Sequence, residues 1–322
     1  MTRTPTRPAI RAPVPAAVRE PARTAPRAGA QRFDRVVVVY NPTSTGDAPG
    51  NAHRLRAELA HRARGTAVEL LRTRHAGHAE QLAERAVTEH PATLVVSASG
   101  DGGYHEVVNG VLRARRRRPG AGVCAVLASG NANDHARAVQ DRPLADAIVA
   151  GAVTGMDLLQ VLVDDREPRY AHSYVGLGIT PVVAVEFNRH DLDALREGVL
   201  AVRTVWRYRP LTITHGGRRV ELDSLVFANI DRMAKYATLS RTSSPTDGTY
   251  ESVLIRHRGA LALLASVLRL VRGTHEAVPR REPYAFTTST PMPLQLDGEV
   301  HRVGAGASVV VSCAAGAVSV VR

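Results

Sequence analysis

Four short apolar runs, separated by polar and amphipathic stretches, mark the first half of the chain. The runs are Val36–Tyr40, Ala67–Leu71, Thr93–Ser97 and Val123–Leu127. Runs of this length are typical of buried strands. Between the second and third runs, apolar residues from Ala79 to Val87 recur at helical spacing. Strands that alternate with helices predict an α/β domain with a mostly parallel sheet and helices on its faces.

The pattern changes near Asp157, where short alternating segments replace the strand–helix alternation. These segments are Leu159–Val163, Tyr174–Ile179, Leu211–Thr214, Ser224–Ala228, Ser252–Ile255, Phe286–Thr288 and Ser308–Ser312. One helical pattern, Leu261–Val271, interrupts them. Spacing and turn residues of this kind predict an antiparallel β-sandwich. We therefore expect an α/β domain over residues 33–155 and a β-rich domain over residues 156–322.

The first 32 residues differ in composition from the rest. They hold seven arginines and one glutamate among many prolines and alanines, and so carry half of the net charge of +12. Such a segment cannot bury enough apolar surface to fold, and residues 1–32 are predicted to be a disordered basic tail. The chain has two cysteines and no apolar run long enough to span a membrane, which favours a reducing, cytoplasmic compartment.

A glycine-rich turn follows the third apolar run. The segment from Ser99 to Gly103 stands between that strand and a predicted helix whose valines share one face. Glycines allow a backbone to approach a ligand closely, and the first N–H groups of a helix attract phosphate. With the carboxylate of Asp101 in the turn and Glu106 just after it, the segment indicates a nucleotide-phosphate site.

Polar residues also follow the other predicted strands: Asn41, Thr73 and the segment Ser129–Asn133. The carboxyl ends of parallel strands meet at one edge of a sheet, where ligands bind. We therefore expect all four loops to converge on one site. A P-loop kinase is excluded, because its phosphate loop needs a lysine and the only lysine of the chain is Lys235.

The glycine-rich stretch Ser99–Gly110 resembles the Gly-Gly-Asp-Gly signature of the diacylglycerol kinase catalytic domain. This domain is shared by bacterial lipid kinases, by sphingosine and ceramide kinases and, more distantly, by NAD kinases. Further matches follow in the expected order: Asn41-Pro42-Thr43-Ser44, Thr73 with Gly77-His78-Ala79, Ser129–Asp134, Asp247-Gly248 and Leu296-Asp297-Gly298-Glu299. The resemblance covers roughly residues 34–300. It implies an α/β nucleotide domain followed by a β-rich domain.

The resemblance also implies the site residues and the cofactors, ATP and Mg²⁺. The implied nucleotide-binding residues are Asn41, Thr73, Ser99, Gly100, Asp101, Gly102, Gly103, Glu106, Gly130, Asn131 and Asn133. Asp247 matches the position at which family members bind magnesium. The same residue could equally be an ordinary turn residue.

The catalytic base has three candidates. Asp297 and Glu299 lie two residues apart, so on an extended segment they would face one side, where a carboxylate pair can raise one pKa. The resemblance to bacterial members implies Glu299 or Asp297 as the base, whereas sphingosine-kinase-like members imply Asp101. The Asp-Gly-Glu sequence is also compatible with a plain hairpin turn.

Three departures from the family pattern predict weaker nucleotide contacts. Thr45-Gly46-Asp47 stands where a glycine and a basic residue are usual, and Asp47 would place negative charge beside the phosphates. Gly103 and Asn131 stand where threonines are usual. Each lost hydroxyl contact is worth about 0.5–1.5 kcal/mol.

These observations predict an ATP-dependent lipid kinase that phosphorylates a membrane lipid hydroxyl, of diacylglycerol or a sphingoid-type lipid. The alternatives are an NAD kinase-like enzyme and a catalytically weak nucleotide- or lipid-binding protein of the same fold. Arg113, the cluster Arg115–Arg118 and the basic tail predict peripheral association with an anionic membrane surface. Nucleic acid is not expected as a partner, because aromatics make up 4% of the chain and none interleaves with the cluster. The sequence leaves open whether the protein forms a homodimer.

Overall fold

The computed structural model describes residues 31–164, 166–179, 209–233, 237–238 and 243–322. The predicted basic tail, apart from its last two residues, lies outside the described residues, and so does Lys235. No helix in the described part of the chain is long and apolar enough to cross a bilayer.

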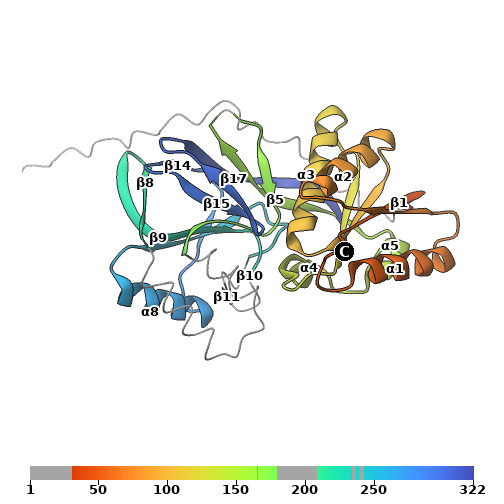
Figure 1. Ribbon diagram of the computed structural model, residues 1–322, viewed down its shortest axis with the longest axis horizontal. Helices are drawn as coiled ribbons and strands as arrows, with labels where there is room; N and C mark the ends of the chain where they lie inside the picture. Colours follow the sequence, from red (N-terminus) through yellow and green to blue (C-terminus); the bar gives the residue numbers. More distant parts are fainter. Residues whose placement is uncertain (1–30, 165, 180–208, 234–236, 239–242) are drawn as a thin grey trace, which may run out of the picture.

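The first region is a parallel sheet covered by helices on both faces (Figure 1). Its elements are β1 (Arg35–Tyr40), α1 (Ala48–Arg62), β2 (Ala67–Arg72), α2 (His78–Glu89), β3 (Leu94–Ser99), α3 (Asp101–Arg117), β4 (Val123–Ala128), α4 (Asp134–Val139) and α5 (Leu144–Ala150). The strands lie in the order β2-β1-β3-β4 and all pair in parallel. Helices α2 and α3 cover one face, and α1 and α5 cover the other.

The second region is antiparallel and rich in strands. Its elements are β5 (Val153–Val163), β6 (Arg169–Ala171), β7 (Tyr174–Gly178), β8 (Leu211–His215), β9 (Arg218–Ala228), β10 (Arg232–Met233), β11 (Ala237–Thr238), β12 (Tyr250–Arg256), α8 (Ala260–Val271), β13 (Val278–Arg280), β14 (Tyr284–Thr288), β15 (Met292–Leu296), β16 (Glu299–Val303) and β17 (Ser308–Val321). The predicted fold class, a parallel α/β region followed by an antiparallel β-rich region, is confirmed.

Strands β5 and β17 join the two regions. They pair with each other along almost their whole length, and Val320 at the end of β17 pairs in parallel with Cys124 of β4. The C-terminus therefore lies in the α/β half of the molecule (Figure 1). The predicted division near residue 155 falls inside β5 rather than between two elements.

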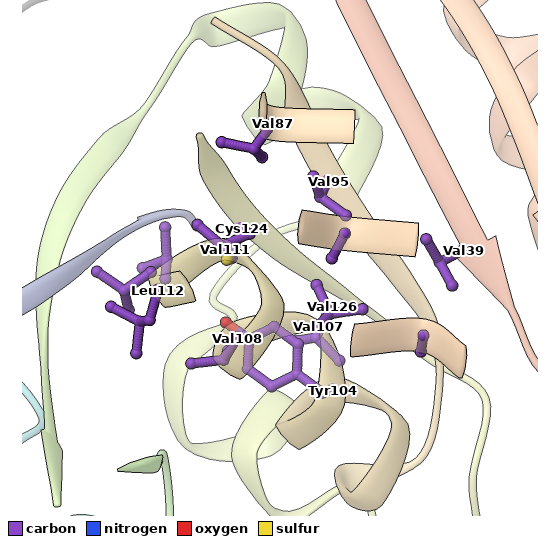
Figure 2. Packing of buried hydrophobic residues seen from close by; sticks show 14 of the residues in the cluster. Val39, Val87, Val95, Tyr104, Val107, Val108, Val111, Leu112, Cys124 and Val126 are labelled. Atoms are coloured by element: carbon purple, nitrogen blue, oxygen red, sulfur yellow. The ribbon is translucent and has the colours of Figure 1, made fainter. Parts of the chain in front are cut away.

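Helix α3 is held to the sheet by an apolar face, as its sequence predicts. Figure 2 shows Val107, Val108 and Val111 of α3 packed toward Val95 and Cys124 of the neighbouring strands. All five side chains are fully buried. Because this face fixes the helix, its first turn is held at the carboxyl end of β3, where the glycine-rich turn lies.

Arg115 at the end of α3 is a structural residue, and the prediction that it belongs to an exposed basic cluster is wrong. Its guanidinium is buried and donates hydrogen bonds to the carbonyl oxygens of Ala121, Gly122 and Ala317. These bonds fasten the end of α3 to β17. Arg116 forms an ion pair with Glu167, with 2.7 Å between nitrogen and oxygen.

Candidate active site

A cleft of about 1010 Å³ lies at the carboxyl ends of β1, β2 and β3. The predicted site residues that line it are Asn41, Thr73, Ser99, Gly103, Glu106 and Glu299. Five basic or imidazole side chains that the sequence analysis did not select also line it: Arg72, Arg74, His75, His78 and Arg85. Cationic side chains around a cleft favour anions, and a phosphate chain is such a ligand.

The glycine-rich turn packs directly against the loop that follows β4. A Cβ atom on Gly130 would lie 2.4 Å from the Cα atom of Gly100, so the two backbones touch where only glycine fits. A Cβ atom on Gly103 would lie 2.4 Å from Oγ of Ser99. Position 103 therefore has no room for the threonine side chain that is usual there.

Asp101 does not line the cleft but caps the short helix α4. Its two carboxylate oxygens accept hydrogen bonds from the backbone N–H groups of Asp134 and His135, both at 3.1 Å. Asn133 exchanges hydrogen bonds with the N–H and carbonyl groups of Gly130, at 2.8 and 2.7 Å. Asn131 lies exposed in the same loop. These contacts fix the two loops to each other.

Glu106 performs the same role for α2. Its carboxylate accepts hydrogen bonds from the N–H groups of Gly77, at 2.7 Å, and Ala79, at 3.0 Å. These N–H groups belong to the first turn of α2, which otherwise has no side-chain cap. The carboxylate thus joins α3 to α2 beside the cleft.

Asp297 is a buried acceptor. It accepts hydrogen bonds from Nδ1 of His105, at 2.9 Å, and from the backbone N–H groups of His172, Ser173 and Tyr174, at 2.8–3.1 Å. Its side chain is fully buried. Burial alone would raise its pKa, but the neighbouring His172 and the hydrogen bond from His105 outweigh it and lower the pKa to about 2. A carboxylate with these contacts is a poor proton acceptor near neutral pH.

The expectation that Asp297 and Glu299 face one side is wrong, because the segment is a hairpin turn and not extended. Leu296 pairs with Glu299 across the turn, and Asp297 and Gly298 have φ angles of 49° and 99°. Such a two-residue turn with positive φ at both positions is typical of Asp-Gly hairpins. It points Asp297 inward, whereas Glu299 stays exposed and lines the cleft.

Glu299 approaches the glycine-rich turn from the β-rich region. A Cβ atom on Gly102 would lie 2.8 Å from Oε1 of Glu299. The carboxylate therefore stands directly beside the turn that the sequence predicts to hold phosphate. Of the three candidate bases, Glu299 alone combines exposure with a place in the cleft.

A group of buried rings beside Asp297 was missed by the sequence analysis. His135 and His172 have ring centroids 4.5 Å apart, and Tyr104 lies 4.9 Å from each. Both ring nitrogens of His135 are buried and have no hydrogen-bond partner. Burial and the neighbouring His172 lower the pKa of His135 well below its usual value, so the ring is neutral. No local sequence pattern points to this group, because Tyr104, His135 and His172 come together only in the fold.

Asp247 lies in a turn and is not among the described residues that line the cleft. Its Oδ1 atom accepts hydrogen bonds from the N–H and hydroxyl groups of Thr249, at 2.8 and 2.7 Å. Asp157 accepts a hydrogen bond from the next residue of the turn, Gly248. No group of three histidine, cysteine, aspartate or glutamate side chains suited to a metal occurs among the described residues. Asp247 is therefore not part of such a group, and its role as a magnesium ligand stays a prediction.

Asp47 is the N-cap of α1 and is absent from the described lining of the cleft. Its carboxylate accepts a hydrogen bond from Gly50 N–H at 3.1 Å and lies 3.5 Å from the guanidinium of Arg54. Capping and this ion pair account for an aspartate at this position. The predicted negative charge beside the phosphates is therefore partly offset by Arg54.

Comparisons with known proteins agree with this geometry. Residues 35–161 match the family model of the diacylglycerol kinase catalytic domain, so the resemblance inferred from the motifs is confirmed and supports a kinase. No curated protein matches the chain.

Solved structures share the fold. Two structures provisionally assigned as a diacylglycerol kinase from Bacillus anthracis str. Sterne are 17% identical, with TM-scores of 0.66 and 0.67, and cover 90% of this chain and 99% and 98% of their own. A third, of a diacylglycerol kinase from the same organism, is 18% identical, with a TM-score of 0.65, and covers 90% of this chain and 98% of its own. At these identities the likeness establishes the two-region fold.

Proposed function

We propose that this chain transfers the γ-phosphoryl group of ATP to the hydroxyl group of a membrane lipid, either diacylglycerol or a sphingoid-type lipid. The observation that carries the proposal is the position of Glu299, which reaches the glycine-rich turn from the β-rich region. An exposed carboxylate beside a phosphate-binding turn is suited to accept the proton of an attacking hydroxyl. The kinase-family match over residues 35–161 supports the donor.

The cleft supplies the contacts that a nucleoside triphosphate needs. Backbone N–H groups of the turn and of the first turn of α3 face anionic ligands favourably. Arg74 and Arg85, which line the cleft together with Thr73, add positive charge. In this proposal, these groups hold the phosphates while Asn41 and Thr73 contact the rest of the nucleotide.

The transfer step then needs one proton acceptor. Glu299 takes the proton from the lipid hydroxyl while the hydroxyl oxygen forms a bond to the γ-phosphorus. The bond between this phosphorus and the β–γ bridging oxygen breaks, and ADP is released. Asp297 and His105 act as positioning residues, because they hold the turn that carries Glu299. Asp101 positions α4 and the loop after β4.

A divalent cation would offset charge on the phosphates during this step. Magnesium usually binds through one or two carboxylates together with substrate phosphates. The described residues form no three-ligand centre of their own, so no part of the step above is assigned to a metal.

The test is phosphoryl transfer from radiolabelled ATP with a total lipid extract, followed by separation of the products. We expect label in a lipid phosphate monoester with the wild-type protein, and a rate of labelling lower by about 10²–10⁴-fold with Glu299→Gln. The same assay with NAD in place of lipid tests the alternative acceptor. Label in NADP, or no labelled lipid from correctly folded wild-type protein, would overturn the proposal.

A further inference from the structure

Helix α8 is apolar on both of its faces, although the described residues cover only one of them. On the inner side, Leu263 packs with Ile179 and Ile255, and Leu270 packs against the sheet strands. On the outer side, Leu261 is 75% exposed and Leu268 is 45% exposed. A helix that is apolar all round is normally buried, so the outer face of α8 requires a further contact.

The outer leucines form one stripe. Leu261, Ala265 and Leu268 follow each other at four- and three-residue spacing, are all exposed, and lead to the exposed Arg272 at the end of the helix. Among the described residues, five large apolar side chains are exposed, and three of them, Leu261, Leu268 and Val278, lie on α8 and the neighbouring β13. Exposed apolar groups that gather in one place mark an interaction site.

A basic cavity adjoins this stripe. It measures about 560 Å³ and lies between β12, α8 and β13. Among the described residues that line it, four are arginines (Arg256, Arg258, Arg269 and Arg280) and one, Glu276, is acidic. Apolar side chains beside a group of arginines match a bilayer surface, where acyl chains lie below anionic phosphates.

We infer that the outer face of α8, with three of these arginines, docks the protein on an anionic lipid bilayer. Leu261 and Leu268 enter the acyl boundary, and Arg256, Arg258 and Arg269 contact lipid phosphates. The choice of a bilayer as occupant rests on the proposed function, because a lipid kinase must meet its acceptor at a membrane. This surface differs from the predicted cluster Arg115–Arg118, in which Arg115 is buried and Arg116 is paired with Glu167.

The experiment measures binding of the full chain to vesicles of phosphatidylcholine with and without phosphatidylglycerol. We expect wild type to bind only the anionic vesicles, and more weakly as salt rises. The double variant Leu261→Ser/Leu268→Ser should bind the anionic vesicles at least about tenfold more weakly than wild type. The double variant Arg256→Gln/Arg258→Gln should also weaken binding by at least about tenfold. Val149→Ser, which changes an exposed valine of α5, is the matched apolar control, and Arg56→Gln/Arg64→Gln, at two exposed positions on and just after α1, is the matched charge control.

Circular dichroism and thermal unfolding establish that each variant is folded, and sedimentation establishes its oligomeric state. Equal vesicle binding by wild type and the leucine variant, or no binding by wild type, would overturn the inference. A loss of self-association in the leucine variant without a loss of vesicle binding would assign the face to a second copy instead. Transfer to detergent-dispersed lipid, measured in parallel, separates the two proposals: it tests the kinase function in the absence of a bilayer.

Discussion

The cleft and the buried polar cluster, which consists of Asp297 with His105 and the segment 172–174, both take a carboxylate from the Asp-Gly-Glu motif. They differ in the environment of that carboxylate. In the cluster, Asp297 accepts four hydrogen bonds and is fully buried. In the cleft, Glu299 is exposed beside Gly102. Both belong to one hairpin turn. One motif can therefore supply an anchoring residue and a reactive residue two positions apart, and burial determines which residue has which role.

The substitution Glu299→Gln should have the largest effect. A general base contributes about 10²–10⁴-fold to the rate, so we expect kcat to fall by this factor while ATP affinity is unchanged. Glu221→Gln, at an exposed position of β9, is the control and should be fully active. Unchanged kcat with weaker ATP binding would place Glu299 in nucleotide binding and remove the contrast with Asp297.

The substitution Asp297→Asn should act on stability before it acts on the rate. An amide cannot accept all four hydrogen bonds of the carboxylate, so we expect the free energy of unfolding in urea to fall by about 3 kcal/mol. Asp34→Asn, at an exposed position, should change it by less than about 0.5 kcal/mol. An equal stability of Asp297→Asn and wild type would show that the cluster is not an anchor.

The pH dependence of the same variant sharpens this point. The pKa of Asp297 is lowered from 3.8 to about 2 in the folded protein. Its contribution is therefore present above pH 4 and is lost as the pH falls from about 4 towards 2. Wild type should lose stability across this range, and Asp297→Asn should lose about 2 kcal/mol less.

His135 should make the cluster sensitive to milder acid. The pKa of His135 in the folded protein lies well below its usual value of 6.5. As the pH falls, the unfolded chain therefore binds a proton at a higher pH than the folded protein does, and stability falls as the pH drops from about 7 to 5. The loss is at most about 2 kcal/mol over this interval. Thermal unfolding of His135→Leu at pH 7 and pH 5 should show a smaller difference than wild type. His61→Leu, at an exposed position, should behave like wild type.

The smallest effect is expected for Glu106→Ala, at the border between the cleft and the helices. Loss of the cap on α2 should cost about 1 kcal/mol in urea unfolding. Glu84→Ala, on the same helix as the capped N–H groups, is the control. A large loss of ATP affinity with unchanged stability would instead assign Glu106 to the nucleotide.

The two-region fold and the edge of the sheet at which the cleft lies could be predicted from the amino-acid sequence alone. Helical and strand periodicities depend on neighbouring residues, so runs such as Val36–Tyr40 could be recognised without knowing what covers them. Because β1, β2 and β3 pair in parallel, Asn41, Thr73 and the glycine-rich turn, which follow these strands, lie at one edge of the sheet. For the same reason the helix face of Val107, Val108 and Val111 was evident from spacing alone.

Which charged residues are buried became evident from the folded structure and not from the sequence. His105 and Asp297 are 192 positions apart and meet because β15 and β16 return to the first turn of α3. Arg115 stands in a run of arginines, yet β17 covers it and its neighbours stay accessible. Burial of a polar group depends on contacts between distant segments and on whether these satisfy its hydrogen bonds. Sequence spacing contains neither, and this is why Asp297 and Glu299 could not be distinguished before the fold was known.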